Sequence, residues 1–178
     1  MTALSAIDIA SAEPAGSLTA SPGKTAGRSA AEPAARLVFE VAGQIFAVAV
    51  ARVREILDLQ PISPLPNAPA DLLGMIDVRG KGVAVIDLHA RLGLRSVDRE
   101  EGRILVFEIG SANVPVAAIA DRVIAVAEIP DDEIEPAPES LTGWRADALR
   151  GVARLDGRIT MILDLDRIFH DKDPFDFE

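Results

Sequence analysis

The sequence predicts a mainly β protein composed of two similar halves, and two observations support this prediction. Many short runs of Val, Ile and Leu are interrupted by Gly and Pro, which is typical of short strands joined by tight turns. In addition, residues 149–169 align without a gap on residues 72–92, with each residue shifted by 77 positions. A repeat with about five short strands per unit predicts two pseudo-symmetric five-stranded β-barrels with short helical turns and a C-terminal helix.

Strands of the first unit are expected where apolar and β-branched residues cluster between turn residues, at 36–41, 45–50, 75–79 and 83–88. Residues 51–59, which contain VREIL, fit either a short helical turn or a bent strand. The loop at 61–69 holds four prolines, which cannot donate hydrogen bonds to a strand ladder. Asp87 and its repeat equivalent Asp164 follow the two hairpins, and we expect them to cap short helices.

The chain divides into a folded region and two tails. Residues 1–35 are rich in Ala, Ser, Gly and Pro with few large apolar residues, so we interpret them as a disordered tail. The folded region is expected at 36–170, with barrels at approximately 36–95 and 103–170, and an exchange of strands at their boundaries is left open. Residues 171–178 are interpreted as an acidic C-terminal tail.

The net charge of −10 excludes several classes of partner. Residues 103–178 carry 8 basic and 16 acidic side chains, so that −8 of the total resides there. Without a basic stripe, nucleic acid and anionic membrane surfaces are disfavoured. The absence of Cys excludes disulfides and thiolate sites, and no apolar run approaches the ~20 residues of a membrane span. A soluble cytoplasmic protein is the expectation.

Residues suited to catalysis are few. The two histidines, His89 and His170, follow the repeated Asp-Leu motifs and are expected at the surface near helix ends. No Ser stands in a nucleophile-elbow context, and no His or Cys pair has metal-ligand spacing. The acidic run at 131–135 lacks the ligand alternation and central Gly of a calcium loop and is interpreted as a solvated loop. We therefore expect no enzyme activity, no cofactor and no metal.

The turn at 79–82 requires a separate explanation. Gly80 and Gly82 join two strand-like segments and can supply the positive φ angles of a hairpin, whereas a phosphate-binding loop would open a helix. Arg79 has no such structural reason, because its repeat equivalent is Asp156. Glu55 is a plausible ion-pair partner, and an exposed pair contributes only ~0–1 kcal/mol to stability. We favour an interface role for Arg79, with a purely structural role as the alternative.

Four segments carry, in order and spacing, a resemblance to a known family: LVFEVAGQIFAVAVARVREIL, PLPNAPADLLGMIDVRGKGVAVIDLHARLGL, VPVAAIADRVIAVAEIPDDEIEPAPE and LRGVARLDGRITMILDLDRIF. They cover about residues 36–170, and they resemble the chemotaxis coupling protein (CheW) family. The resemblance implies two five-stranded SH3-like β-barrels around a shared hydrophobic interface, in agreement with the internal repeat.

The resemblance also implies a function. It indicates a non-enzymatic adapter that couples the cytoplasmic tips of chemoreceptors (methyl-accepting chemotaxis proteins) to the regulatory domain of the histidine kinase CheA. Self-association in arrays and a cytoplasmic location at membrane-associated receptor arrays, without membrane insertion, follow from the same likeness. The alternatives are a scaffold of a non-flagellar chemosensory pathway, controlling pili or surface attachment, and a small-ligand-binding β-barrel protein.

Carried over motif by motif, the partner-binding positions are Val53, Glu55, Gly74, Arg79 and Gly80. At the junction of the two barrels, the apolar residues Ile86 and Ile104 are candidates for the groove that takes the receptor tip.

The chain departs from the family pattern at two positions. Asp77 replaces the Asn of the family's N-L-R-G turn, which adds a charge near Arg79 and a possible rival to Glu55. Ala84 replaces a customary Pro, so that this strand gains a hydrogen-bond donor. These departures bear on the choice of partner and leave the predicted fold unchanged.

Overall fold

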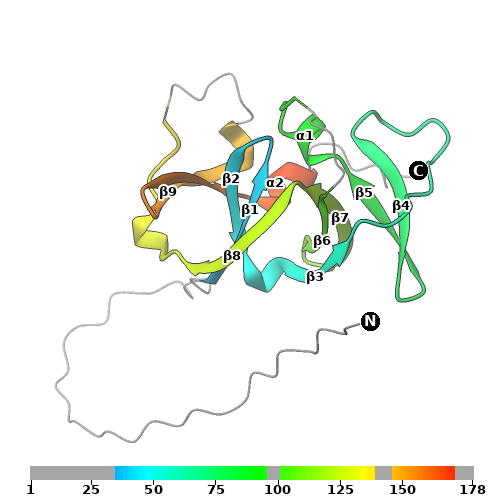
Figure 1. The fold of residues 1–178 in the computed structure, drawn as a ribbon, viewed down its shortest axis with the longest axis horizontal. Helices are drawn as coiled ribbons and strands as arrows, with labels where there is room; N and C mark the ends of the chain where they lie inside the picture. The colour runs from blue at the N-terminus through cyan, green and yellow to red at the C-terminus, as the bar shows by residue number, and fades with distance from the viewer. Residues whose placement is uncertain (1–34, 96–100, 139–145, 171–178) are drawn as a thin grey trace, which may run out of the picture.

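The computed structural model describes residues 35–95, 101–138 and 146–170 (Figure 1). The first strand begins at Ala35, one residue before the expected start of the folded region. The disordered tail predicted at the N-terminus and the acidic tail predicted at 171–178 lie outside the described residues, except for Ala35 itself.

In the described part of the chain, ten strands form two antiparallel-rich sheets of five strands each (Figure 1). The first sheet has the order β8 (Arg122–Glu128), β1 (Ala35–Val41), β2 (Gln44–Ala49), β10 (Arg158–Leu163) and β9 (Leu149–Leu155). The second sheet has the order β3 (Val53–Asp58), β6 (Arg103–Ile109), β7 (Val114–Ala120), β5 (Lys81–Ile86) and β4 (Leu72–Val78). The two orders match when β1 and β2 are replaced by β6 and β7, and β8, β9 and β10 by β3, β4 and β5, as a duplication requires.

Each sheet combines strands from both halves of the sequence. The pair β1–β2 joins β8, β9 and β10, whereas the pair β6–β7 joins β3, β4 and β5. The two halves are connected within the sheets by the parallel pairings of β2 with β10 and β5 with β7, and by the antiparallel pairings of β1 with β8 and β3 with β6. The strand pairs β1–β2 and β6–β7 are therefore exchanged between the ranges 36–95 and 103–170.

Short helical segments complete the fold. The segment 51–59 contains both of the structures expected for it, because a 3₁₀ turn at Val50–Arg52 leads into β3. The helices α1 (Leu88–Arg91) and α2 (Leu165–His170) follow β5 and β10. Asp87 accepts hydrogen bonds from the backbone N–H groups of the first turn of α1, and Asp164 accepts one from Arg167 of α2 at 3.2 Å. The capping role predicted for the repeated aspartates is confirmed.

Among the described residues, three apolar clusters hold the sheets together. One cluster belongs to the second sheet and contains Ile76, Val85 and Val106. A second belongs to the first sheet and contains residues such as Val38 and Ile162. The third and largest takes residues from both sheets and both helices, so it packs the two sheets against each other. The mainly β fold class with two five-stranded units and few helices is confirmed.

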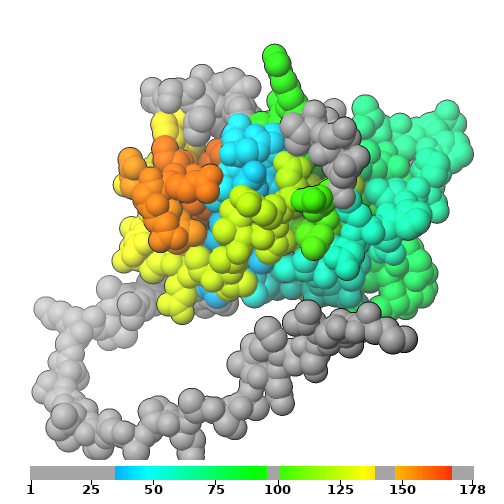
Figure 2. Space-filling view, in the orientation of Figure 1, coloured from blue at the N-terminus to red at the C-terminus, as the bar shows by residue number. Residues whose placement is uncertain are grey.

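The molecular surface reflects this arrangement. In the space-filling view (Figure 2), β9 lies at one end of the molecule, β4 and the loop that leads into it lie at the other, and β1, β2 and β8 lie between them. The middle of the molecule is therefore the place where the first and second halves of the chain meet.

The internal repeat extends to backbone detail. A Cβ atom on Gly74 would lie 2.2 Å from the Ser63 carbonyl oxygen, and a Cβ on Gly151 would lie 2.4 Å from the Glu135 carbonyl oxygen. These two carbonyl-bearing residues form isolated bridges to β4 and β9. Each bridge therefore connects the segment that follows one edge strand, β3 or β8, with the opposite edge strand of the same sheet.

One sequence-based expectation about the fold is wrong. His89, predicted at the surface, is fully buried, with Nε2 3.1 Å from Asp121 Oδ1 and Nδ1 3.5 Å from Asp87 Oδ1. The reason is the position of α1, whose first residue Leu88 belongs to the cluster between the sheets. The side chain of His170 lies outside the described residues.

Candidate functional site

The turn between β4 and β5 has a defined backbone geometry. The pairs Asp77–Gly82 and Val78–Lys81 leave Arg79 and Gly80 as a two-residue turn, with φ angles of 55° and 80°. Positive φ at both central residues is the mirror-image turn that matches strand twist. The prediction that Gly82 also supplies a positive φ is wrong.

Other contacts explain the remaining polar and small residues of this turn. A Cβ on Gly82 would lie 2.7 Å from Cε of Met75, so this glycine makes room for a side chain. Asp77 Oδ1 accepts a hydrogen bond from Gly80 N at 3.0 Å. Asp77 thus stabilises the turn itself, in the manner of Asp in other turns.

Arg79 and Glu55 form a two-point ion pair. Arg79 Nε lies 2.8 Å from Glu55 Oε1, and Arg79 Nη2 lies 3.3 Å from Glu55 Oε2. The predicted partnership is confirmed, and Glu55 rather than Asp77 is the partner. The pair joins β3 to the β4–β5 turn, that is, the two ends of the second sheet.

The exposure of the two partners is unequal. The Arg79 side chain is 78% exposed and the Glu55 side chain 15% exposed. The anion is therefore fixed on the sheet, whereas the planar guanidinium group faces solvent. A pair so exposed contributes ~0–1 kcal/mol to stability. This gain is small beside the cost of holding a residue with a Cβ in the left-handed conformation.

Val53 and Gly74 occupy supporting positions. Val53 begins β3, is half-buried and packs against the cluster between the sheets. The register of β3 against β6 shifts between Val53 and Glu55, which bends the strand. Gly74 is buried with φ of 143° beneath Ser63, so it shapes the strand and offers no surface to a partner.

Ile86 and Ile104 require a correction. Their exposed fractions are 1% and 0%, and they belong to different clusters, Ile86 to the one between the sheets and Ile104 to the one inside the second sheet. The apolar pattern of their segments comes from strands buried on both faces. Neither side chain is accessible to a partner, and we assign both to the core.

Three exposed apolar residues that sequence reasoning missed lie on edge strands. Ile56 on β3 and Ile124 and Val126 on β8 have exposed fractions of 44%, 42% and 61%. β3 and β8 hold equivalent places in the two sheets. The sequence RVIAVAE offered a signal, because a strand with large apolar residues at alternate positions presents them on one face.

Polar contacts join the sheets at two equivalent places. The acidic and basic residues have exchanged positions between the two. In one, Asp121 Oδ2 accepts from Ala42 N at 2.6 Å and Asp121 Oδ1 faces His89 of α1. In the other, Asp166 of α2 accepts from Gly110 N at 2.9 Å and pairs with Arg52. Each contact joins a helix to a hairpin turn, and the anion comes from the residue before β8 in one and from the helix in the other.

The described residues offer little for catalysis or metal binding. Within 35–95, 101–138 and 146–170, no group of three or more His, Cys, Asp or Glu side chains is placed to hold a metal ion. Neither α1 nor α2, nor any other helix in that part of the chain, is long and apolar enough to span a membrane.

Comparison with known proteins shows which family this chain resembles. The family model of the CheW-like domain matches residues 36–173. The chemotaxis protein CheW of Rhizobium meliloti (strain 1021) is 31% identical over 133 residues, which are 75% of this chain and 85% of that protein. The CheW of Treponema pallidum (strain Nichols) is 26% identical over 140 residues, 77% and 82% of the two chains.

A solved structure agrees with the sequence matches. The crystal structure of the scaffolding protein TtCheW from Thermoanaerobacter tengcongensis is similar with a TM-score of 0.70 and 29% identity, covering 77% of this chain and 92% of that one. The fold and the matches define a scaffold or adapter protein of chemotaxis signalling, which acts through protein partners and is not an enzyme. The chain belongs to the CheW family.

Proposed function

We propose that this protein couples the cytoplasmic tips of chemoreceptors to the regulatory domain of a CheA-type histidine kinase, and that the Arg79 turn belongs to the coupling surface. One observation carries the assignment of this surface. Arg79 is presented to solvent on a pre-shaped turn, although the ion pair contributes little to stability and the repeat has Asp156 at the same place. Arg is also enriched among residues that dominate protein–protein binding.

The neighbouring residues have distinct roles in this proposal. Glu55 orients the guanidinium group through two contacts, so that less side-chain freedom is lost when a partner binds. Gly80 allows the left-handed turn, and Val53 anchors the bent start of β3. Gly74 acts indirectly by keeping β4 close to the Ser63 segment.

The remaining parts of the proposal concern location and assembly. The protein is placed in the cytoplasm at receptor arrays through its partners, and it associates with further copies or with the kinase in those arrays. Edge strand β3, which carries Glu55, also carries the exposed apolar side chain of Ile56, which is the kind of surface that such contacts use.

The test uses the full chain with receptor-containing membranes and a CheA-type kinase. Co-sedimentation should show that the protein joins the membrane fraction and changes kinase autophosphorylation. Arg79→Glu should weaken association with at least one partner by about tenfold or more, because it removes the binding cation and places two carboxylates side by side. Its melting temperature should stay within about 2 °C of the parent, as expected for an exposed pair.

Arg122→Glu is the matched control. Arg122 is 66% exposed and pairs with Glu40 at 2.7 Å across β1 and β8, so it has the same chemistry in the first sheet. If the control weakens association as much as Arg79→Glu does, the turn is not a specific surface. If the parent protein joins neither receptor nor kinase, the proposed function fails as a whole.

A further inference from the structure

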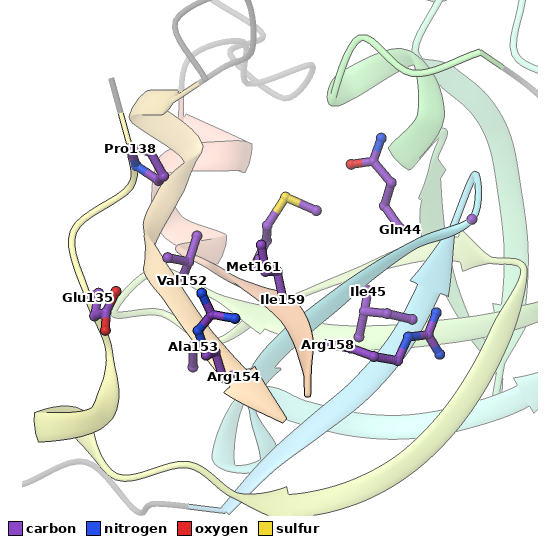
Figure 3. A pocket seen from close by; sticks show the side chains of 11 residues that line it. Gln44, Ile45, Glu135, Pro138, Val152, Ala153, Arg154, Arg158, Ile159 and Met161 are labelled. Carbon is purple, nitrogen blue, oxygen red and sulfur yellow. The ribbon is translucent and has the colours of Figure 1, made fainter. Parts of the chain in front are cut away.

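A hollow of about 510 Å³ opens at one end of the first sheet (Figure 3). We call it the β2–β10 hollow, after the starts of the two strands that flank it. Strand β9 and the segment that follows β8 complete its lining. The apolar side chains of Ile45, Val152, Ile159 and Met161 and the cationic side chains of Arg154 and Arg158 contribute to its wall.

The hollow is open because two neighbouring strands diverge. Parallel β2 and β10 are paired only at Met161–Phe46 and Ile162–Ala47, so the residues before these positions leave a gap. The equivalent place in the second sheet has a larger side chain on one strand and a glycine on the next. In the second sheet, Met75 stands at the position of Val152, and its Cε lies over Gly82, which stands at the position of Ile159.

The side chains that line the hollow indicate the kind of ligand that it binds. Ile159 is 59% exposed, which is unusual for a large apolar side chain beside a cavity and indicates a partner surface. Within the described parts of the chain, neither Arg154 nor Arg158 forms an ion pair. Figure 3 shows Arg154 on the β9 side and Arg158 on the β2 side of the hollow. With the exposed Glu135 included, the lining has one net positive charge, and it suits a peptide that combines acidic and aromatic residues.

The chain itself contains such a peptide directly after α2. Residues 171–178 read DKDPFDFE, with four acidic side chains, one Lys and two Phe. Phe supplies apolar area for Ile159 and Met161, and the flanking carboxylates complement the two guanidinium groups. None of the described residues offers the same combination in so short a stretch.

The length of this segment is sufficient. Strand β10 leads from the hollow to α2 over roughly 17 Å at ~3.3 Å per residue, and α2 adds or subtracts roughly 9 Å at ~1.5 Å per residue. Phe175 and Phe177 are the fifth and seventh residues after α2, and an extended chain carries them roughly 17–18 Å and 23–25 Å from its end at ~3.3–3.6 Å per residue. Phe177 therefore reaches the β2–β10 hollow of its own chain over nearly the whole range of paths, whereas Phe175 reaches it where α2 shortens the path.

We propose that residues 171–178 bind in the β2–β10 hollow of the same molecule, with Phe175 or Phe177 against Ile159 and Met161 and with carboxylates beside Arg154 and Arg158. The hollow is then an intramolecular peptide-binding site. Any partner that uses this end of the first sheet competes with the segment. This inference does not depend on the Arg79 surface and is tested on the isolated full chain.

The test observes methyl groups of Ile and Met by NMR in the full-length protein. An aromatic ring against Ile159 and Met161 displaces their methyl resonances, and Phe175→Ala/Phe177→Ala should abolish this displacement. The methyl resonances of Ile124, which is exposed on β8 away from the hollow lining, should not change. If the double variant leaves Ile159 and Met161 unchanged, the proposal is wrong.

A second pair of variants tests the charges. Arg154→Glu/Arg158→Glu should produce the same loss as the Phe variant, and Arg154→Lys/Arg158→Lys should retain most of the displacement. Both arginines are exposed, so folding should be kept, and circular dichroism verifies this. The displacement should not change on tenfold dilution. A displacement that fades on dilution would assign the hollow to the segment of a second copy and would overturn the intramolecular proposal.

Discussion

Gly74 is required at its position because another segment of the chain packs closely against it, and not because it forms a turn. It combines a φ of 143° with a carbonyl oxygen 2.2 Å from where a Cβ would stand, and Gly151 repeats the close approach at 2.4 Å. Two equivalent glycines in equivalent bridges indicate that the close approach is part of the architecture. Arg79 differs in this respect, because its repeat equivalent keeps the backbone angle and changes the side chain.

Gly74→Ala should therefore destabilise the protein strongly. Backbone strain and the collision with Ser63 together should lower the free energy of unfolding by about 2–3 kcal/mol. Gly43→Ala is the control, since it has a positive φ but no atom within 4 Å of the place where its Cβ would stand, and should cost only about 1 kcal/mol. Urea denaturation measures both values, and equal losses would refute the role of the close approach.

Asp77→Ala should act on the turn rather than on the ion pair. Losing the hydrogen bond to Gly80 N should cost about 0.5–1.5 kcal/mol, as for other local side-chain to backbone bonds. Asp77→Asn should keep most of that stability, because the amide oxygen can accept the same bond. If Asn is as destabilised as Ala in thermal melts, the carboxylate charge matters more than the turn.

At the residue scale, predictions of a contact from charge and position in the sequence were correct. Predictions of whether a side chain is buried or exposed were wrong for His89 and Ile86, because burial depends on the packing of distant segments. The Glu55 partnership with Arg79 and the capping by Asp87 follow from charge and position, and the structure has both. The burial of His89 follows from the packing of α1 between the sheets, where Asp121 from a distant part of the sequence faces its ring. The assignment of Ile86 to a groove failed because an apolar strand pattern does not reveal how many faces are covered.

At the scale of elements, each helix is short and depends on its cap. α1 has only the residues Leu88–Arg91, and Asp87 Oδ1 accepts from His89 N at 2.9 Å and from Ala90 N at 3.3 Å. Such a helix could not form alone, because nucleation is costly and few hydrogen bonds follow. Burial of Leu88 and the cap together hold it between the sheets.

Asp87→Ala should cost more than Asp164→Ala. Asp87 accepts two backbone hydrogen bonds in a buried position, whereas Asp164 accepts one at 3.2 Å with its side chain 29% exposed. We expect about 1–2 kcal/mol for Asp87 and about 0.5–1 kcal/mol for Asp164, within the range of helix caps. Chemical denaturation of the two variants side by side checks the order, and a reversed order would contradict it.

At this scale, the sequence did not predict that the pairs β1–β2 and β6–β7 are exchanged between the two sheets. Repeats at 72–92 and 149–169 identified the hairpins β4–β5 and β9–β10, but antiparallel pairing within a hairpin does not say which distant strand lies beside it. The partner of β2 is set by the core between the sheets, and that contact has no local signature.

At the scale of the whole molecule, one cluster contains residues of both sheets and both helices. The two sheets should therefore unfold together, although each has an apolar cluster of its own. Leu105 is fully buried in the shared cluster and comes from the second sheet. Its substitution is a direct probe of this coupling.

Leu105→Ala should lower the free energy of unfolding by about 2–5 kcal/mol, as for other buried Leu truncations. Native-state hydrogen exchange should show equal loss of protection for core amides of the first sheet, such as Val48, and of the second, such as Val85. Loss confined to the second sheet would show that the sheets unfold independently.

The exchanged strands have a consequence during synthesis on the ribosome. Arg36, in the first strand, donates from Nε to the carbonyl oxygen of Ile129, 93 residues later. When β1 and β2 emerge, none of their outer neighbours exists, because β8 and β10 have not yet been translated. A nascent chain released after the first repeat would carry a hairpin with two unpaired edges, so the first sheet cannot be finished until its last strand has left the exit tunnel.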